Sequence, residues 1–233
     1  MNEIATVSHG SSLTLTGDQE FWTDKQVAAL RQLGVDRATN GDLAVFMHVA
    51  QRTGLDPFAK QIYMVERQGK QTIQTGIDGF RLVARRSVDA SGESLSISGG
   101  EWCGPDGQWL DVWLASHPPA AARVTVERGG HTFVGVALLQ EYIQRKRDGD
   151  PNAQWSQRPA HMLAKCAEAL ALRKAFPMDL SGVYTDDELG QAEARVSSRT
   201  RSSVADVLAD EAAVVEGEIV PDGVAPETGE VMS

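Results

Sequence analysis

Basic and aromatic side chains are interleaved in the first half of this 233-residue chain. Between residues 60 and 86 the sequence holds six lysines and arginines against two carboxylates. Phe58, Tyr63 and Phe80 lie beside or among these cations. Proteins that bind single-stranded nucleic acid combine cations, which contact phosphates, with rings on which bases stack. The segment therefore predicts a surface for single-stranded nucleic acid, and the alternative is that each ring is a core residue.

A second basic pattern lies on a helix expected from Pro159 to Phe176. At about 100° per residue, Arg158, Lys165 and Arg173 fall within about 80° of each other on this helix. Trp155 comes just before them and adds an aromatic ring. The pattern favours a basic ridge that contacts phosphates. The alternative is a solvated helix face without a ligand.

Motifs for enzymatic chemistry are scarce. The sequence has no GxxxxGK[ST], HExxH or GxSxG motif, and Gly76-Ile77-Asp78-Gly79 lacks the third glycine of a dinucleotide fingerprint. Its histidines are scattered singly, and its two cysteines have no paired spacing, so we expect free thiols and no zinc site. The run Asp186-Asp187-Glu188 could hold Mg²⁺ in a nuclease. The alternative for this run is a helix cap or a solvated loop.

The net charge of −10 belongs to the end of the chain. Residues 186–233 carry twelve Asp and Glu against three Arg, whereas residues 1–185 carry 19 basic against 20 acidic side chains. The acidity of the whole chain therefore does not argue against a polyanionic ligand for the body.

The sequence predicts an α+β fold, a mainly antiparallel sheet flanked by helices, with a disordered N-terminal arm and an acidic C-terminal tail. Hydrophobic residues make up 42% of the chain, enough for a sizeable core. We expect three regions: a flexible arm over 1–20, a binding domain over 21–189 and a disordered tail over 190–233. No stretch has the length of a membrane span or the layout of a signal peptide, which predicts a cytoplasmic protein.

Local patterns predict the elements that position these residues. Thr23 and Gln26 have capping-box spacing, and a second helix should run from about Thr39 to Gly54. Alternation from Ile62 to Thr75 predicts a hairpin with basic rims. Asp78 should cap a helix that ends near Ser87 and carries Arg81 and Arg85 on one face. The remaining predicted elements are strands over 94–102, 108–114, 121–127 and 132–138, a short helix over 139–146 and the helix over 159–176.

Three segments together resemble the RecT/Redβ (phage recombination protein Bet) family of single-strand annealing proteins. The first, residues 54–63, is similar to the family segment GL[ND]P[FW]xxxIY, and the second, residues 76–80, to G[IV]DG[FWY]. The third comprises residues 155–173 and 181–188, similar to the closing helix and the GxYxxDE stretch. In order and spacing the resemblance covers roughly residues 20–190.

This resemblance implies an ATP-independent protein that binds single-stranded DNA, forms homo-oligomeric rings or filaments and anneals complementary strands in phage recombination. It implies no catalytic residue and no cofactor, with Mg²⁺ as a possible ion that screens phosphates. Lys60 and Arg173 lie where the family pattern is also basic. The full set of candidate DNA-contact residues is Lys60, Lys70, Arg81, Arg85, Trp155, Arg158, Lys165, Arg173 and Lys174.

The chain also departs from the family pattern. Ala160, His161 and Ala164 stand where Redβ-type members are more basic, which lowers the expected density of phosphate contacts there. The short acidic tail could occupy the basic groove as a DNA mimic, contact a partner exonuclease or the host single-strand binding protein, or serve solubility alone. Two other functions stay open: a Mg²⁺-dependent nuclease or nuclease subunit, and a structural oligomer of the phage particle.

Overall fold

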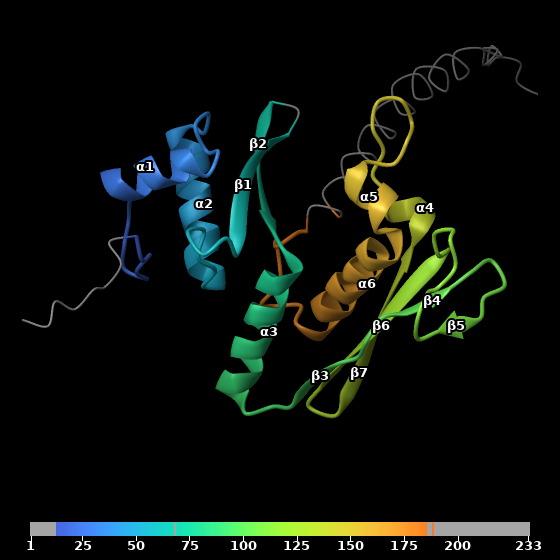
Figure 1. Ribbon diagram of the computed structural model, residues 1–233. Coiled ribbons are helices and arrows are strands. Elements are labelled where there is room, and N and C mark those ends of the chain that lie inside the picture. Colours follow the sequence, from blue (N-terminus) through green and yellow to red (C-terminus); the bar gives the residue numbers. More distant parts are fainter. Residues whose placement is uncertain (1–12, 68, 186–187, 189–233) are drawn as a thin grey trace, which may run out of the picture. The chain divides into compact units, whose positions relative to one another are not determined.

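A computed structural model describes residues 13–67, 69–185 and 188. Figure 1 shows helices together with antiparallel strands, which confirms the predicted α+β class. In chain order the elements are α1 (Asp24–Gln32), α2 (Asn40–Thr53), β1 (Ile62–Arg67), β2 (Lys70–Thr75), α3 (Ile77–Ser91), β3 (Leu95–Ile97), β4 (Glu101–Cys103), β5 (Trp109–Leu110), β6 (Ala121–Arg128), β7 (His131–Leu138), α4 (Leu139–Tyr142), α5 (Ala153–Gln157) and α6 (Pro159–Ala175). The predicted tail over 190–233 and residues 1–12 of the predicted arm lie outside the described residues.

The later part of the predicted arm, residues 13–20, is attached to the first two helices. The Gln51 side chain of α2 donates a hydrogen bond to the Thr16 carbonyl at 3.0 Å. The buried Gln26 side chain of α1 donates to the Leu13 carbonyl at 3.4 Å. This stretch is therefore held by Gln51 and by Gln26, to which the sequence pattern assigned only a role in helix capping.

Both N-terminal helices begin at capping boxes. Thr23 accepts a hydrogen bond from the Gln26 amide, and the Gln26 side chain bonds back to the Thr23 amide. Thr39 and Asp42 make the same reciprocal pair at the start of α2. α2 ends at Gly54, whose φ of 63° is left-handed and stops the helix. These starts and the Gly54 stop confirm the predicted helices.

The hairpin of β1 and β2 has the predicted alternation. Ile62 and Met64 are buried at 1% and 3% exposure, whereas Tyr63 between them is 39% exposed. The Thr75 amide at the end of β2 donates to the Tyr184 carbonyl at 2.9 Å. The hairpin is thereby joined to a segment that lies far away in the sequence.

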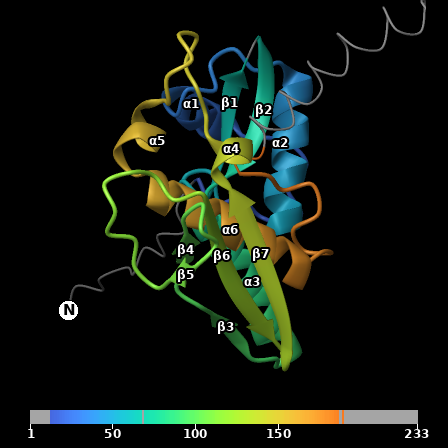
Figure 2. The same cartoon turned by 90° about the vertical axis from the view of Figure 1, so that its right-hand side faces the viewer.

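A five-stranded antiparallel sheet forms the second half of the described chain. β6 pairs with β7 along one edge and with β3 and β4 along the other, and β5 pairs with β4. α6 packs over β6 and β7 on one face, while the opposite face is turned toward the viewer in Figure 2. Alternate residues of β6, Ala122, Val124 and Val126, are buried on the helix side.

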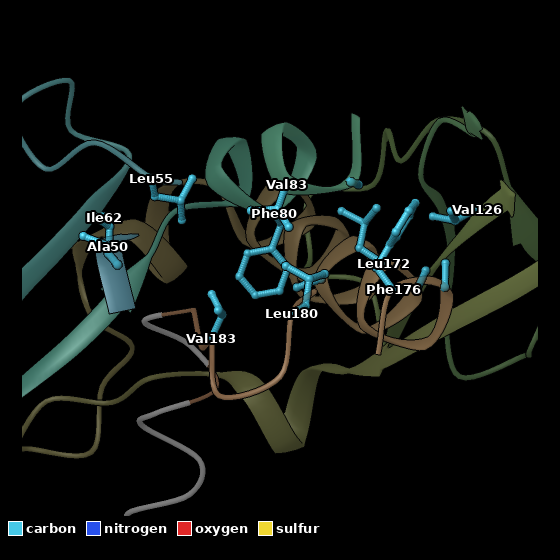
Figure 3. Close-up of a cluster of buried hydrophobic side chains, with 14 of the residues drawn as sticks. Ala50, Leu55, Ile62, Phe80, Val83, Val126, Leu172, Phe176, Leu180 and Val183 are labelled. Atoms are coloured by element: carbon cyan, nitrogen blue, oxygen red, sulfur yellow. The ribbon is translucent and has the colours of Figure 1, made fainter. Parts of the chain in front are cut away.

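Buried side chains form two clusters, and α6 contributes to both. The first cluster includes Phe80, Leu172 and Leu180 (Figure 3). The second cluster surrounds Leu163 and Trp155. α6 is therefore the element through which the two parts of the core are connected.

Three predicted elements differ in extent from the structure. The strand predicted over 94–102 is divided into β3 and β4, because Ile97 pairs with Val126 and Glu101 with Arg123, four steps against three on β6. The strand predicted over 108–114 stops at Leu110. The helix predicted over 139–146 is only one turn, α4.

The start of α3 also differs from the prediction. Gly76, and not Asp78, is its N-cap residue, and no side chain caps this helix. Asp78 lies in the first turn instead and accepts a hydrogen bond from Arg81.

Candidate nucleic-acid interface

The outer side of the hairpin brings an aromatic ring and two cations together. Arg67 is paired directly opposite Lys70, so their side chains lie on the same face, and Tyr63 is four residues before Arg67 on β1. Tyr63 and Lys70 are exposed. This hairpin face, made of Tyr63, Arg67 and Lys70, offers a ring for a base and positive charge for phosphates.

Lys60 lies in the turn that leads into β1. Its amide donates to the Pro57 carbonyl at 3.1 Å, and its φ is 59°. Among the described residues it is the non-glycine residue with a left-handed backbone. Such a conformation costs free energy that a glycine would avoid. The exposed Lys60 side chain is thus held near β1 by a turn that its residue type does not favour.

Arg81 of α3 is bound by carboxylates of the chain itself. Its Nε and Nη2 atoms donate to the two oxygens of Glu168 on α6 at 2.6 and 2.7 Å. Its Nη1 donates to Asp78 at 2.9 Å. The hydrogen bonds to Glu168 raise the pKa of Arg81 above its ordinary value. Arg81 therefore joins α3 to α6, and phosphate contact would have to use the half of its side chain that is exposed.

Arg85 follows Arg81 by one turn of α3, as the sequence predicts. Its side chain is 57% exposed, and its guanidinium is 4.0 Å from the Asp89 carboxylate. An exposed pair at this separation contributes little to stability. Arg85 is consequently far more available to a phosphate than Arg81.

Arg173 near the end of α6 is enclosed by groups from α3 and from the segment that follows α6. Its Nη2 donates to both oxygens of Glu188, at 2.8 and 2.7 Å. The guanidinium lies over the rings of Tyr184 and Phe80, with centroid distances of 4.9 and 5.5 Å. A phosphate at Arg173 would compete with a carboxylate that already occupies it.

The other cations of the predicted ridge have different surroundings. Arg158 is exposed and precedes the first residue of α6. Lys165, two turns further along α6, is half-buried and therefore less exposed than Arg158. Arg158 has a non-helical φ of −140°, so α6 itself carries only Lys165 and Arg173 of the predicted ridge, and both are partly buried.

Trp155 is not a surface residue, which corrects its predicted role in base stacking. Its ring is 1% exposed and packs in the second core cluster. Phe80 is likewise fully buried, as expected for the alternative of a core ring. The exposed rings nearest the candidate cations are Tyr63 and Tyr184, at 39% and 44% exposure.

Lys174 contacts the edge strand β7 of the five-stranded sheet. Its ammonium donates to the Val134 carbonyl of β7 at 2.7 Å. Within the described residues no strand pairs with this outer edge of β7. The contact is typical of a lysine that covers unpaired backbone groups at a sheet edge.

The carboxylate of Glu188 accepts hydrogen bonds from two residues of the chain. Besides Arg173, it accepts hydrogen bonds from the amide and hydroxyl of Thr185 at 2.9 and 3.0 Å. Asp186 and Asp187 lie outside the described residues. Throughout the part of the chain that the structure describes, no cluster of three His, Cys, Asp or Glu side chains is close enough to hold a metal ion. In the same part, every helix is too short or too polar to span a membrane.

Tyr184 was missed as a candidate by the search for aromatics among cations. The cation that its ring contacts, Arg173, is eleven residues earlier in the chain, so local interleaving gives no signal. The resemblance of residues 181–188 to a family segment was the available signal. The Tyr184 ring contacts Arg173, and the carbonyl of Tyr184 accepts a hydrogen bond from the Thr75 amide of the hairpin.

Exposed cations beside an exposed ring are a feature that proteins binding single-stranded nucleic acid share. The family model of RecT matches residues 20–201, far more than half of the chain. The chain therefore belongs to the RecT family, whose members are DNA-binding recombination proteins of the annealing type. Comparison with curated proteins gave no match.

Proposed function

We propose that this protein binds single-stranded DNA through Lys60, the hairpin face and the exposed cations Arg85 and Arg158, and anneals complementary strands without ATP. Membership of the RecT family over residues 20–201 is the observation that carries this proposal. The exposed ring and cations of the hairpin support it, because annealing needs phosphates neutralised and bases left free to pair. Sequence is then read by base pairing and not by the protein.

The working form is a homo-oligomer, a ring or a filament, in the cytoplasm of a bacterial host cell. It acts beside a partner exonuclease and the host single-strand binding protein, and Mg²⁺ serves only to screen phosphates. The support for these points is the family alone. The reaction forms and breaks no covalent bond, so no catalytic residue is required.

Annealing of two complementary oligonucleotides, followed by fluorescence quenching without ATP, tests the proposal. We expect acceleration by the wild type, and a smaller one by Lys60→Ala and Lys70→Ala, because each loses a phosphate contact. The affinity for single-stranded DNA should fall about threefold to tenfold per lysine, and the salt dependence should lose roughly 0.7 in slope.

Lys146→Ala is the matched control. Lys146 is about half exposed, but its ammonium already faces Asp148 at 3.2 Å, so its loss should leave annealing unchanged. An equal loss in the control would mean that bulk charge, and not this surface, binds DNA. Mg²⁺-dependent degradation of labelled DNA would instead favour the nuclease alternative.

A further inference from the structure

Arg173 and Tyr184 repeat, at the end of α6, the combination of a cation with an exposed ring that the hairpin face shows. The Tyr184 ring is 44% exposed, and its centroid lies 4.9 Å from the Arg173 guanidinium. The Arg173 side chain is itself 27% exposed, so solvent reaches it. Such a pair suits a phosphate and a base of single-stranded nucleic acid. Its cation, however, is bound by a carboxylate of the chain, that of Glu188.

The pairing of Glu188 with Arg173 uses one nitrogen of the guanidinium. Both oxygens of Glu188 accept from Nη2 of Arg173, at 2.8 and 2.7 Å. Glu168 instead accepts from two nitrogens of Arg81, Nε and Nη2, in a planar fork. The hydrogen bonds that Arg173 donates to described residues all come from Nη2. Glu188 therefore holds Arg173 by fewer donors than Glu168 holds Arg81.

The occupied arginine lies at the base of the hairpin. The Thr75 amide at the end of β2 donates to the Tyr184 carbonyl at 2.9 Å. Val183 packs with Phe80 in the first core cluster (Figure 3). The Phe80 ring in turn lies 5.5 Å from the Arg173 guanidinium. Arg173 and Tyr184 are thus fixed next to the element that carries the candidate DNA site.

Glu188 belongs to the acidic end of the chain. Residues 186–233 carry twelve Asp and Glu against three Arg. The segment before it is anchored in the domain, because Val183 and Thr185 are each 2% exposed. A carboxylate and a phosphate compete for the same guanidinium. An exchange of the two at Arg173 would give up the hydrogen bonds of Glu188 but would leave the buried residues in place.

We propose that Glu188 inhibits the binding of single-stranded DNA by occupying Arg173 in the free protein, and that a DNA phosphate displaces it beside the Tyr184 ring. When only a fraction of the molecules has the competent form, the apparent affinity is reduced by that fraction. The contact therefore sets how readily the domain takes up DNA. This inference rests on the proposed function and names a regulation of the same DNA site.

Glu188→Gln tests the contact through the fluorescence anisotropy of a labelled oligothymidylate across a salt series. Glutamine removes the charge but keeps an amide oxygen that can accept from Thr185. We expect the affinity to rise roughly threefold to tenfold, because Arg173 is no longer held by a carboxylate. The salt dependence should steepen by at most about 0.7 in slope, since no carboxylate is released to attract salt cations when a phosphate binds.

Arg173→Met shows whether the effect passes through this arginine. Methionine keeps an apolar stem against Phe80 but has no charge to offer. In the Arg173→Met background, Glu188→Gln should leave the affinity unchanged, because there is no guanidinium to release. A gain of equal size in both backgrounds would mean that Glu188 acts through bulk charge alone, and this result would overturn the inference.

Glu101→Gln is the matched control. It also removes one negative charge and an ion pair, that with Arg123 in the five-stranded sheet, and it should bind oligothymidylate like the wild type. Urea denaturation measures the folding of each variant. A misfolded Glu188→Gln would bind less DNA, whereas the inference requires a gain.

The outcomes separate this contact from the proposed function. Equal affinities of the wild type and Glu188→Gln contradict only the contact. A lower affinity of a folded Glu188→Gln would show that Glu188 orients Arg173 for DNA and does not block it, which also overturns the inference. If neither protein binds oligothymidylate at low salt, the proposed function fails and the contact fails with it.

Discussion

At the scale of the residue, arginines and lysines of the predicted site have different roles. Arg81 and Arg173 are bound by carboxylates of Glu168 and Glu188 that are about nine-tenths buried. Lys60 and Lys70 are exposed. A planar guanidinium suits two-point pairing with a carboxylate, whereas an ammonium on a flexible stem remains hydrated. The lysines of the hairpin region are therefore the stronger candidates for phosphate contact.

The pair of Glu101 and Arg123 predicts a dependence of stability on pH. Two hydrogen bonds of 2.7 Å from Arg123 lower the pKa of Glu101 below its ordinary value. A lowered pKa contributes stability that is present above the unfolded-state pKa and is lost as the pH falls through the folded-state pKa. Below about pH 4.5 this contribution should therefore decline.

Urea denaturation of the wild type and Glu101→Gln, from pH 7 to pH 3, measures this effect. The variant should be less stable at pH 7, and the difference should shrink toward pH 3. Glu141→Gln, at an exposed position of α4, is the control and should follow the wild type throughout. A constant difference between wild type and Glu101→Gln would show that the ion pair does not titrate with folding.

At the scale of the element, β7 and α6 approach so closely that a side chain cannot lie between them. A Cβ on Gly135 would collide with the Ala167 carbonyl and lie 2.6 Å from the Ala171 nitrogen. Both obstacles are backbone atoms, which cannot move aside as a side chain can. Gly135 is required for the packing of the sheet on its helix.

Gly135→Ala should lower the free energy of unfolding by about 1 to 3 kcal/mol, the usual range for overpacking a core. Gly99→Ala is the control, since a Cβ added at Gly99 would meet no atom within 4 Å and its φ is not left-handed. Its effect should stay within about 0.5 kcal/mol. Equal stabilities of the two variants, measured by urea denaturation, would contradict the close approach.

At the scale of the whole molecule, residues far apart in the sequence meet at the segment after α6. Arg52 of α2 donates to the Ser181 carbonyl at 2.6 Å, and Thr75 of β2 to that of Tyr184 at 2.9 Å. Leu180 is fully buried in the first core cluster. The hairpin that carries the candidate site is thus fixed to the helices and to the end of the domain.

Because α6 contributes to both core clusters, we expect residues 13–185 to unfold in one transition. Leu172→Ala in the first cluster and Leu163→Ala in the second should each cost about 2 to 5 kcal/mol, since both side chains are fully buried. Calorimetry should show one endotherm that shifts to lower temperature in both variants. Two separable endotherms, each sensitive to one substitution, would show that the clusters unfold independently.

Hydrophobic period, capping boxes and turn residues predicted the class of fold, the two leading helices, the hairpin and α6. These signals are local: a capping box involves residues three apart, and alternation is set by the pleat of one strand. They also predicted strands over 94–102 and 108–114, which the structure shortens. Strand length depends on a paired neighbour, and residues 111–114 have none within the described part of the chain.

The sequence by itself determined which residues are cations and rings, and on which helix or strand each one lies. Only the tertiary structure decided which of these cations are bound by other groups of the chain and which of these rings are buried. Arg81 meets Glu168 across 87 positions and Lys174 meets Val134 across 40. Trp155 is buried among residues of α6 and of the five-stranded sheet, and no local pattern around Trp155 indicates that burial. A pattern of a few residues fixes the direction of a side chain from its own element, whereas its partner and its exposure depend on which distant element packs there.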